Sequence, residues 1–146
     1  MIYIFDIDGT IADLSHRLHF IQNKPAKWKE FFLACKDDTP IEDVVLVLKA
    51  LEAGGSRIIL VTGRSDIARR ETIEWFIDFG IPFDELYMRK DGDHREDYIV
   101  KSELLDKVLG NPPGREIDVV FEDRQQVVDM YRSRGLRVFQ VAPGNF

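Results

Sequence analysis

The chain has 146 residues, of which 45% are hydrophobic and 32% are charged, and it carries a net charge of −6. This composition is typical of a globular domain with its own core, so we expect a single domain over residues 1–146. The apolar runs are too short to cross a membrane. The acidic balance disfavours broad electrostatic binding to duplex nucleic acid, but it leaves room for a local basic pocket that binds one phosphate.

Two features bear on where the protein works. Met1 leads directly into an apolar run, with no signal-peptide pattern before it. Cys35 is the only cysteine, so an intramolecular disulfide is excluded, as is usual in a reducing compartment. We expect Cys35 to be buried as a small hydrophobic residue and the protein to be cytoplasmic.

Strands and helices are predicted to alternate along the chain. In order, we expect the strand Ile2–Phe5, the helix Ile41–Ala53, the strand Arg57–Thr62, the helix Asp66–Phe79, the strand Glu85–Met88, the helix Asp97–Leu109, the strand Ile117–Phe121, the helix Gln125–Arg134 and the strand Arg137–Val141. This order predicts an α/β fold in which a Rossmann-like parallel sheet has helices on both faces. In the second of these helices, we expect Ile77 to face the core.

Residues 12–40 are the one long insertion in this pattern, and we expect them to form a small helical cap after the first strand. Two short helices are predicted within it, at Leu14–Ile21 and Ala26–Cys35. Thr39 and Pro40 are typical of an N-cap and a first helical position, so we expect them to begin the next helix.

Two groups of side chains allow more than one interpretation. Trp28, Phe31 and Phe32 lie at helical spacing, where they either pack the cap against the body or offer a surface on which a nucleobase stacks. The charged loop Arg89–Glu96 either contacts a nucleic acid backbone or is simply solvated.

Two carboxylates follow the first strand in the motif Asp6-x-Asp8-Gly9-Thr10. Open α/β sheets bind their ligands at the carboxyl ends of their strands. Carboxylates this close raise each other's pKa, so a cation or a shared proton is needed to hold them together. An ordinary Asp–Gly turn is the alternative interpretation.

Three later segments place polar residues at the same edge of the sheet. Thr62-Gly63-Arg64 offers a hydroxyl, backbone N–H groups and a cation, all of which suit a phosphate. Lys101 lies one turn into a helix, and Glu122-Asp123 follows the fourth strand. Together these residues favour phosphoryl transfer with a hard divalent cation. Taken singly, they are also typical of a turn, a surface lysine and a helix N-cap.

The string FDIDGT resembles the first motif of the haloacid-dehalogenase-like (HAD) hydrolase superfamily. Its later motifs are matched in order and spacing by Thr62, Lys101 and Glu122-Asp123. The resemblance implies that Asp6 is the nucleophile, which forms an aspartyl-phosphate, and that Asp8 is the general acid/base. It also implies Mg²⁺ as cofactor, held by Asp6, by the backbone carbonyl of Asp8 and by the acids of the fourth motif.

A narrower resemblance is to the 3′-phosphatase domain of phage polynucleotide kinase/phosphatase. The matching segments are FDIDGTIAD with Arg17 after it, VTGR, GDHREDYIVKSE and EDRQQVVDMYRSRGLRVFQVAPGNF. The resemblance implies that Arg17 and Arg64 engage the substrate phosphate or support its binding, and that Asp97 is required for activity. We expect the other substrate-binding residues to be Thr10, Thr62 and Gly63.

Two features depart from that family. The fourth motif is Glu122-Asp123 where two aspartates are usual, so we expect Asp123 to be the direct metal ligand and Glu122 to support it. The phosphate loop G-x-x-x-x-G-K-[ST] is absent, so we expect no kinase domain in this chain.

We therefore expect a Mg²⁺-dependent phosphomonoesterase that removes the 3′-phosphate from a polynucleotide end, in a host cytoplasm if its source is a phage. A HAD phosphatase for a small ester, such as a 5′-nucleotidase, is the alternative. A non-catalytic binding module is a third hypothesis, disfavoured because the nucleophile, the acid/base and the lysine are all present. The sequence does not determine the oligomeric state.

Overall fold

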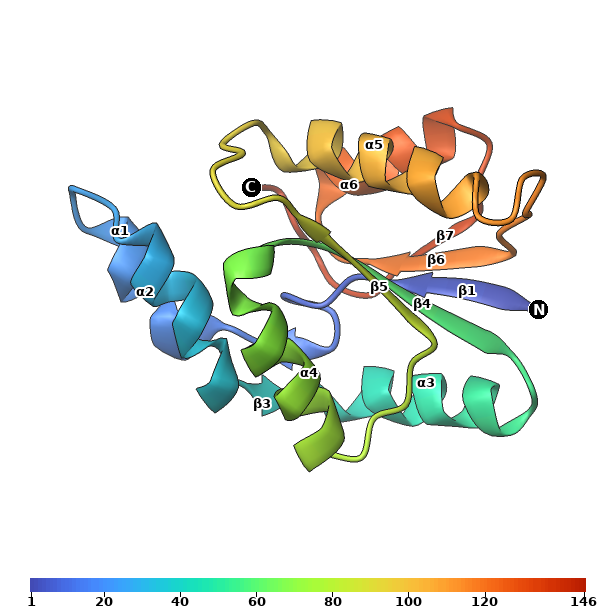
Figure 1. Cartoon of the computed structure of the whole chain (residues 1–146), viewed down its shortest axis with the longest axis horizontal. Helices are drawn as coiled ribbons and strands as arrows, with labels where there is room; N and C mark the ends of the chain where they lie inside the picture. Colours follow the sequence, from blue (N-terminus) through green and yellow to red (C-terminus); the bar gives the residue numbers. More distant parts are fainter.

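The computed structural model describes all of residues 1–146. Five parallel strands form the central sheet, in the order β5-β4-β1-β6-β7 (Figure 1). They are β1 (Ile2–Phe5), β4 (Arg57–Ser65), β5 (Glu85–Arg89), β6 (Val119–Glu122) and β7 (Val138–Gln140). The first strand lies at the centre, so the strand order reverses there. Ligands of open α/β sheets bind outside the carboxyl ends of the strands at such a reversal.

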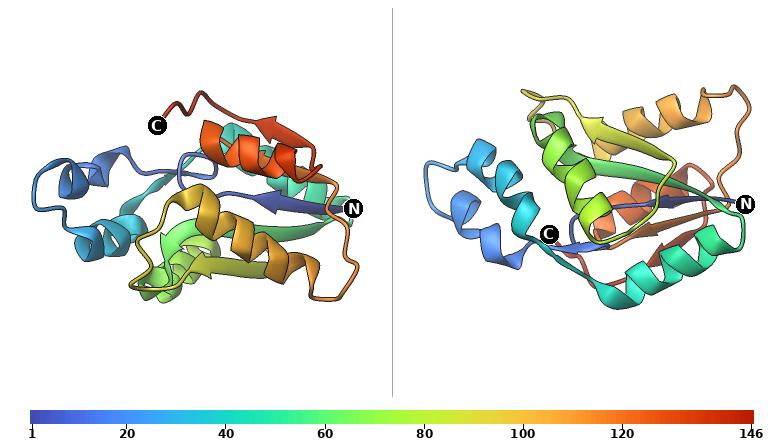
Figure 2. Two further views of the ribbon diagram at one scale, coloured as in Figure 1. Left: turned by 90° about the horizontal axis from the view of Figure 1, so that it is seen from above. Right: turned by 60° about the horizontal axis from the view of Figure 1, so that its bottom comes forward.

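Helices cover both faces of this sheet (Figures 1 and 2). On one face lie α3 (Glu42–Ala53) and α4 (Arg69–Asp78), and on the other α5 (Asp97–Leu109) and α6 (Gln125–Ser133). The predicted Rossmann-like α/β fold is confirmed. None of the helices combines the length and the apolar character that a membrane crossing requires.

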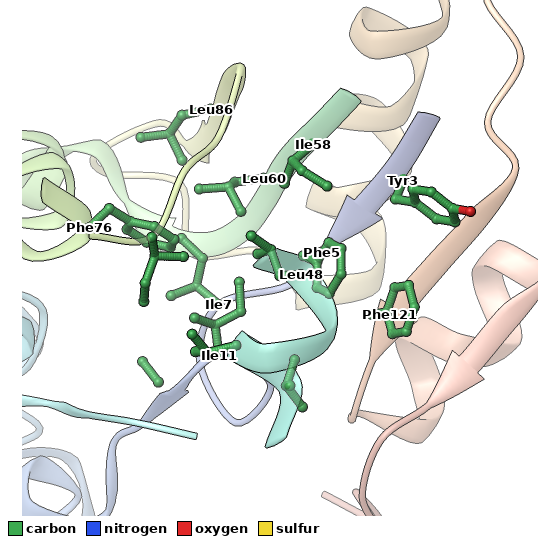
Figure 3. Close-up of a cluster of buried hydrophobic side chains, with 14 of the residues drawn as sticks. Tyr3, Phe5, Ile7, Ile11, Leu48, Ile58, Leu60, Phe76, Leu86 and Phe121 are labelled. Atoms are coloured by element: carbon green, nitrogen blue, oxygen red, sulfur yellow. The ribbon is translucent and has the colours of Figure 1, made fainter. Parts of the chain in front are cut away.

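The core has two layers because alternate residues of β1 point to opposite faces of the sheet. Tyr3 and Phe5 pack under α3 and α4, whereas Ile4 packs under α5 and α6. Figure 3 shows the first layer, where Phe5 stacks on Phe121 with ring centroids 4.3 Å apart. Packing on both faces fixes where β1 ends, and therefore where Asp6 begins the motif.

One residue of α4 lies differently from its prediction. Ile77 is 70% exposed, whereas Trp75 is buried and its indole N–H donates to the carbonyl of Asp38 at 2.8 Å. The buried side of α4 runs through Thr72, Trp75 and Phe76. Ile77 lies about 200° around the helix from Trp75, so it faces solvent.

Residues 12–40 leave the carboxyl edge of the sheet as one excursion (Figure 2). Its ends pair as the short antiparallel strands β2 (Ala12–Asp13) and β3 (Thr39–Pro40). Between them lie η1 (Ser15–Arg17), α1 (His19–Gln22), α2 (Trp28–Leu33) and η2 (Ala34–Asp37). Cys35 is buried there, as expected. The predicted helical insertion is present, and its action as a cap stays a prediction.

The prediction that Thr39 and Pro40 begin the next helix is wrong. Both residues pair with β2, and α3 begins only at Glu42. The backbone N–H of Ile41 donates to the carbonyl of Ile11 at 2.7 Å. Pairing with a distant segment thus overrides the local helix-start signal, and Pro40 is tolerated because edge strands accept a residue without an N–H.

Candidate active site

The predicted residues converge on a cavity of about 1030 Å³ at the carboxyl edge of the sheet. The walls include Asp6, Asp8, Thr62, Gly63, Arg64, Asp97, Lys101, Glu122 and Asp123. They meet because β1 lies between β4 and β6, and parallel strands end at one edge. Of the predicted residues, Thr10 and Arg17 do not line this cavity.

Lys101 is a buried cation among three carboxylates. Its ammonium donates to Asp6 Oδ1 at 2.7 Å and to Glu122 Oε2 at 2.8 Å, and it lies 3.5 Å from Asp97 Oδ2. Burial alone would lower the pKa of Lys101, but the carboxylates raise that pKa well above its usual value. Among them, Asp6 has the largest effect. Lys101 therefore stays charged, and the alternative of a surface lysine is wrong.

One lysine leaves much of the negative charge uncompensated. Oxygens of Asp6, Glu122 and Asp123 lie within 4.8 Å of one another. Burial and nearby carboxylates raise the pKa of Asp6 to about 7 and that of Asp123 to about 6. Burial likewise raises the pKa of Glu122 to about 7. A divalent cation that prefers oxygen ligands would relieve this repulsion, so the donor set fits Mg²⁺.

Glu122 differs from Asp123 in how far its oxygens are already engaged. Glu122 Oε1 accepts hydrogen bonds from the backbone N–H groups of Asp123 and Arg124, both at 3.1 Å. Its Oε2 accepts from Lys101. A metal bound directly to Glu122 would compete with these bonds, whereas Asp123 accepts fewer hydrogen bonds.

We expected Thr10 to bind substrate, but it does not line the cavity and lies behind the carboxylates. It is fully buried, and its hydroxyl is 3.1 Å from Asp6 Oδ2 and 3.4 Å from Asp123 Oδ1. Gly9, with φ +84°, lies beside it, and a Cβ there would overlap the Asp123 carboxylate. The Gly9-Thr10 turn therefore brings the acids after β1 and β6 together.

Two arginines from different elements hold Asp8. Arg17 of η1 and Arg64 of β4 each donate through Nη2 to Asp8 Oδ1 at 2.6 Å. Burial would raise the pKa of Asp8, but the two guanidiniums lower it to about 2, and Arg64 has the larger effect. Arg17 is fully buried, so the alternative of a surface residue is wrong. It does not line the cavity itself, but it holds Asp8, which does.

Asp38 links the same two arginines and is a residue that the sequence did not reveal. Its buried carboxylate accepts from Arg17 Nε and Nη2, both at 2.8 Å, and from Arg64 Nη2 at 3.4 Å. His16 Nε2 lies 2.7 Å from it. Buried arginines need buried counter-charges. The need for a counter-charge such as Asp38 can therefore be recognised only once both arginines are known to be buried.

A bulge in β4 presents the predicted phosphate-binding segment. The register of β4 against β5 shifts between Thr62 and Ser65, and bulges of this kind re-aim residues beside active sites. The backbone N–H of Arg64 donates to Thr62 Oγ1 at 3.1 Å. A Cβ on Gly63 would overlap the carboxylate of Asp97, so glycine is needed for their close approach.

Arg89, at the end of β5, anchors the charged loop to the site. Its Nε donates to the carbonyl of Gly63 at 2.6 Å, and its Nη1 donates to the carbonyls of Asp93 and Arg95 at 3.1 and 2.7 Å. Its Nη2 donates to Asp97 Oδ1 at 3.3 Å. Arg89 thus serves the loop's own structure, a role that neither sequence interpretation of this loop included.

Sequence comparison identifies the family that carries this site. The model of the polynucleotide kinase PNKP phosphatase domain matches residues 1–146. The chain belongs to this family. It is a phosphatase of the HAD fold, and not the non-catalytic module that the sequence left as a hypothesis.

Similar proteins show how this PNKP phosphatase domain compares in length. A protein of Autographa californica nuclear polyhedrosis virus, provisionally described as a bifunctional polynucleotide kinase/RNA ligase, is 26% identical over 129 residues, which are 87% of this chain and 17% of that protein. A solved structure described as the Pnkp1/Rnl/Hen1 complex is 33% identical with a TM-score of 0.83, over 99% of this chain and 46% of the other. The chain thus spans less than half the length of these relatives. The class C acid phosphatase from Bacillus anthracis shares the fold, with a TM-score of 0.68 at 16% identity, over 98% of this chain and 66% of the other.

We expect Asp38→Asn to lower phosphatase activity by about 100-fold, because a shift of about 1 Å in a positioned group is enough for such a loss. The substitution keeps the side-chain shape but removes the charge that orients Arg17 and Arg64. The measurement is the initial rate of phosphate release, with circular dichroism to confirm folding.

Asp37→Asn is the matched control, because Asp37 is the exposed neighbour of Asp38 and forms no ion pair. We expect this control to retain wild-type activity. A folded Asp38→Asn variant with wild-type rates would contradict the positioning role.

Proposed function

We propose that this PNKP phosphatase domain is a Mg²⁺-dependent phosphomonoesterase that removes 3′-phosphate from polynucleotide ends. One observation carries the proposal: Asp6 reaches the cavity with its carboxylate held by Lys101 at 2.7 Å and beside Asp123. A carboxylate nucleophile needs such cationic support to react ionised. The family and the viral relative are both named for a polynucleotide kinase, which supports a nucleic acid substrate.

Asp6, Asp123 and the backbone carbonyl of Asp8 would hold the cation. Glu122 would instead fix Lys101 and the backbone after β6, because its oxygens already accept those hydrogen bonds. When bound, Mg²⁺ would neutralise negative charge on the phosphoryl group and on Asp6.

The reaction has two steps. First, Asp6 attacks phosphorus, and the bond between phosphorus and the 3′-oxygen breaks as Asp8 donates a proton to that oxygen. Then Asp8 removes a proton from a water molecule that attacks the aspartyl-phosphate. Inorganic phosphate leaves, Asp6 is restored as a carboxylate and Asp8 is protonated again.

The first step needs a protonated Asp8, although the arginines hold its pKa at about 2. Arg64 lines the cavity, so a bound phosphate competes with Asp8 for its guanidinium. Losing bonds from Arg64 raises the pKa of Asp8. Substrate binding thereby prepares Asp8 as the acid, while Arg17 keeps it in position from behind.

The remaining predicted residues divide between contact and support. Thr62, Gly63 and Lys101 line the cavity. They would bind phosphate oxygens, Gly63 through its backbone N–H. Thr10 would hold Asp6 against the metal. Asp97 would position Lys101, whose ammonium lies 3.5 Å from Asp97 Oδ2.

We expect Asp6→Asn to lower the rate of hydrolysis at least about a thousandfold, because removing the nucleophile lowers the rate of covalent catalysis by this much or more. With a ³²P-labelled substrate, acid-quenched wild-type enzyme should carry covalent phosphate and the variant none. A folded variant that keeps metal-dependent turnover would refute the nucleophile assignment.

We expect EDTA to abolish activity and added Mg²⁺ to restore it. Asp123→Asn should raise the Mg²⁺ concentration for half-maximal activity by about 10- to 100-fold, as loss of a residue around a metal commonly does. Full activity in EDTA would contradict the metal assignment.

The substrate class is tested by comparing a 3′-phosphorylated oligonucleotide with nucleoside 3′- and 5′-monophosphates and a sugar phosphate. We expect the highest kcat/KM for the oligonucleotide, because a cavity of about 1030 Å³ has room for more than the phosphate group alone. Equal or faster turnover of free 5′-nucleotides would favour the small-ester phosphatase instead.

A further inference from the structure

One wall of the active-site cavity is apolar and comes from the insertion. It is formed by Leu14, Leu18, Ile21, Trp28, Phe31 and Phe32. In Figure 1, α1 and α2, which carry four of these residues, lie beyond the carboxyl end of β1. The acids, the lysine and Thr62 line the inner part of the same cavity.

Trp28 is held in place on this wall yet remains open to the cavity. Its ring stacks on Phe32, with centroids 5.9 Å apart and planes 29° apart, and meets Phe31 edge-on at 5.8 Å. Phe31 is buried, but Trp28 is 46% exposed. Packing of the insertion against the body therefore accounts for Phe31 and leaves the exposed surface of Trp28 unexplained.

The wall is linked through Arg17 to Asp8, which is the acid in the proposed reaction. The Arg17 guanidinium lies 4.5 Å from the Phe31 ring centroid, and its Nη1 donates to the Phe31 carbonyl at 3.3 Å. The same guanidinium donates to Asp8. A group leaving toward Asp8 thus departs on the side of the cavity where Phe31 and Trp28 lie.

We propose that Trp28, supported by Phe32, is the stacking surface for the base of the terminal nucleotide. The inference rests on the proposed function, in which the nucleoside is the leaving group that Asp8 protonates. The ligand is a nucleobase bound through its π-face, so the contact accepts any of the bases. Stacking on Trp28 then favours binding of nucleic acid ends over phosphate esters that carry no base.

The test uses two 3′-phosphorylated oligonucleotides that differ only in the last residue, a normal nucleotide or an abasic one, each made as DNA and as RNA. We expect Trp28→Ala to raise KM for the normal end by roughly 5- to 100-fold. KM for the abasic end should stay within about twofold, and kcat should change little, because stacking binds the substrate before and during the reaction.

Two further variants serve as controls. Trp28→Phe should recover most of the lost affinity, because it keeps an aromatic face. Phe79→Ala removes an aromatic side chain of similar exposure, 44%, that does not line the cavity, and it should leave both KM values unchanged.

Each outcome decides between hypotheses. Loss of affinity confined to the base-bearing end supports the proposal. An equal effect on both ends, or no effect, overturns it while leaving the proposed function intact. Turnover of glycerol phosphate but of neither oligonucleotide overturns the proposed function and this inference with it.

Discussion

Compensation of buried charge at the carboxyl edge of the sheet is the constraint on which this structure depends. Asp6 and Glu122 share Lys101, and Asp8 shares Arg17 and Arg64 with Asp38. Removing one partner of a buried ion pair costs about 3–5 kcal/mol. The elements that carry these groups therefore have to dock together, and the catalytic geometry is a consequence of that docking.

The insertion takes part in this constraint. Arg17 near its start and Asp38 near its end meet over Asp8 and Arg64, and Phe31 packs on Arg17. The ion pairs that hold Asp8 thus also hold Phe31 of the aromatic wall near it. In the proposed reaction, chemistry at the phosphate and contact with the nucleoside are therefore coupled through one buried cluster.

Local patterns allowed much of the site to be predicted. An apolar run followed by Asp6-x-Asp8 marks a strand end, and Thr62-Gly63-Arg64 marks another, so both were found from the sequence. Asp38 was missed because the pair Asp37-Asp38 before Thr39 carries no periodic or motif signal. Thr39 itself was assigned to a helix because its helix-start signal is local, whereas its partner strand lies far away in the sequence.

The sequence alone determined the fold class and the kind of chemistry, because hydrophobic periodicity and short motifs express local rules. Tertiary structure alone decided that Arg17 is buried, that Glu122 serves Lys101, and that Asp38 binds both arginines. The physical reason is that a charged group's pKa and its partners depend on burial and on distances between residues far apart in the chain.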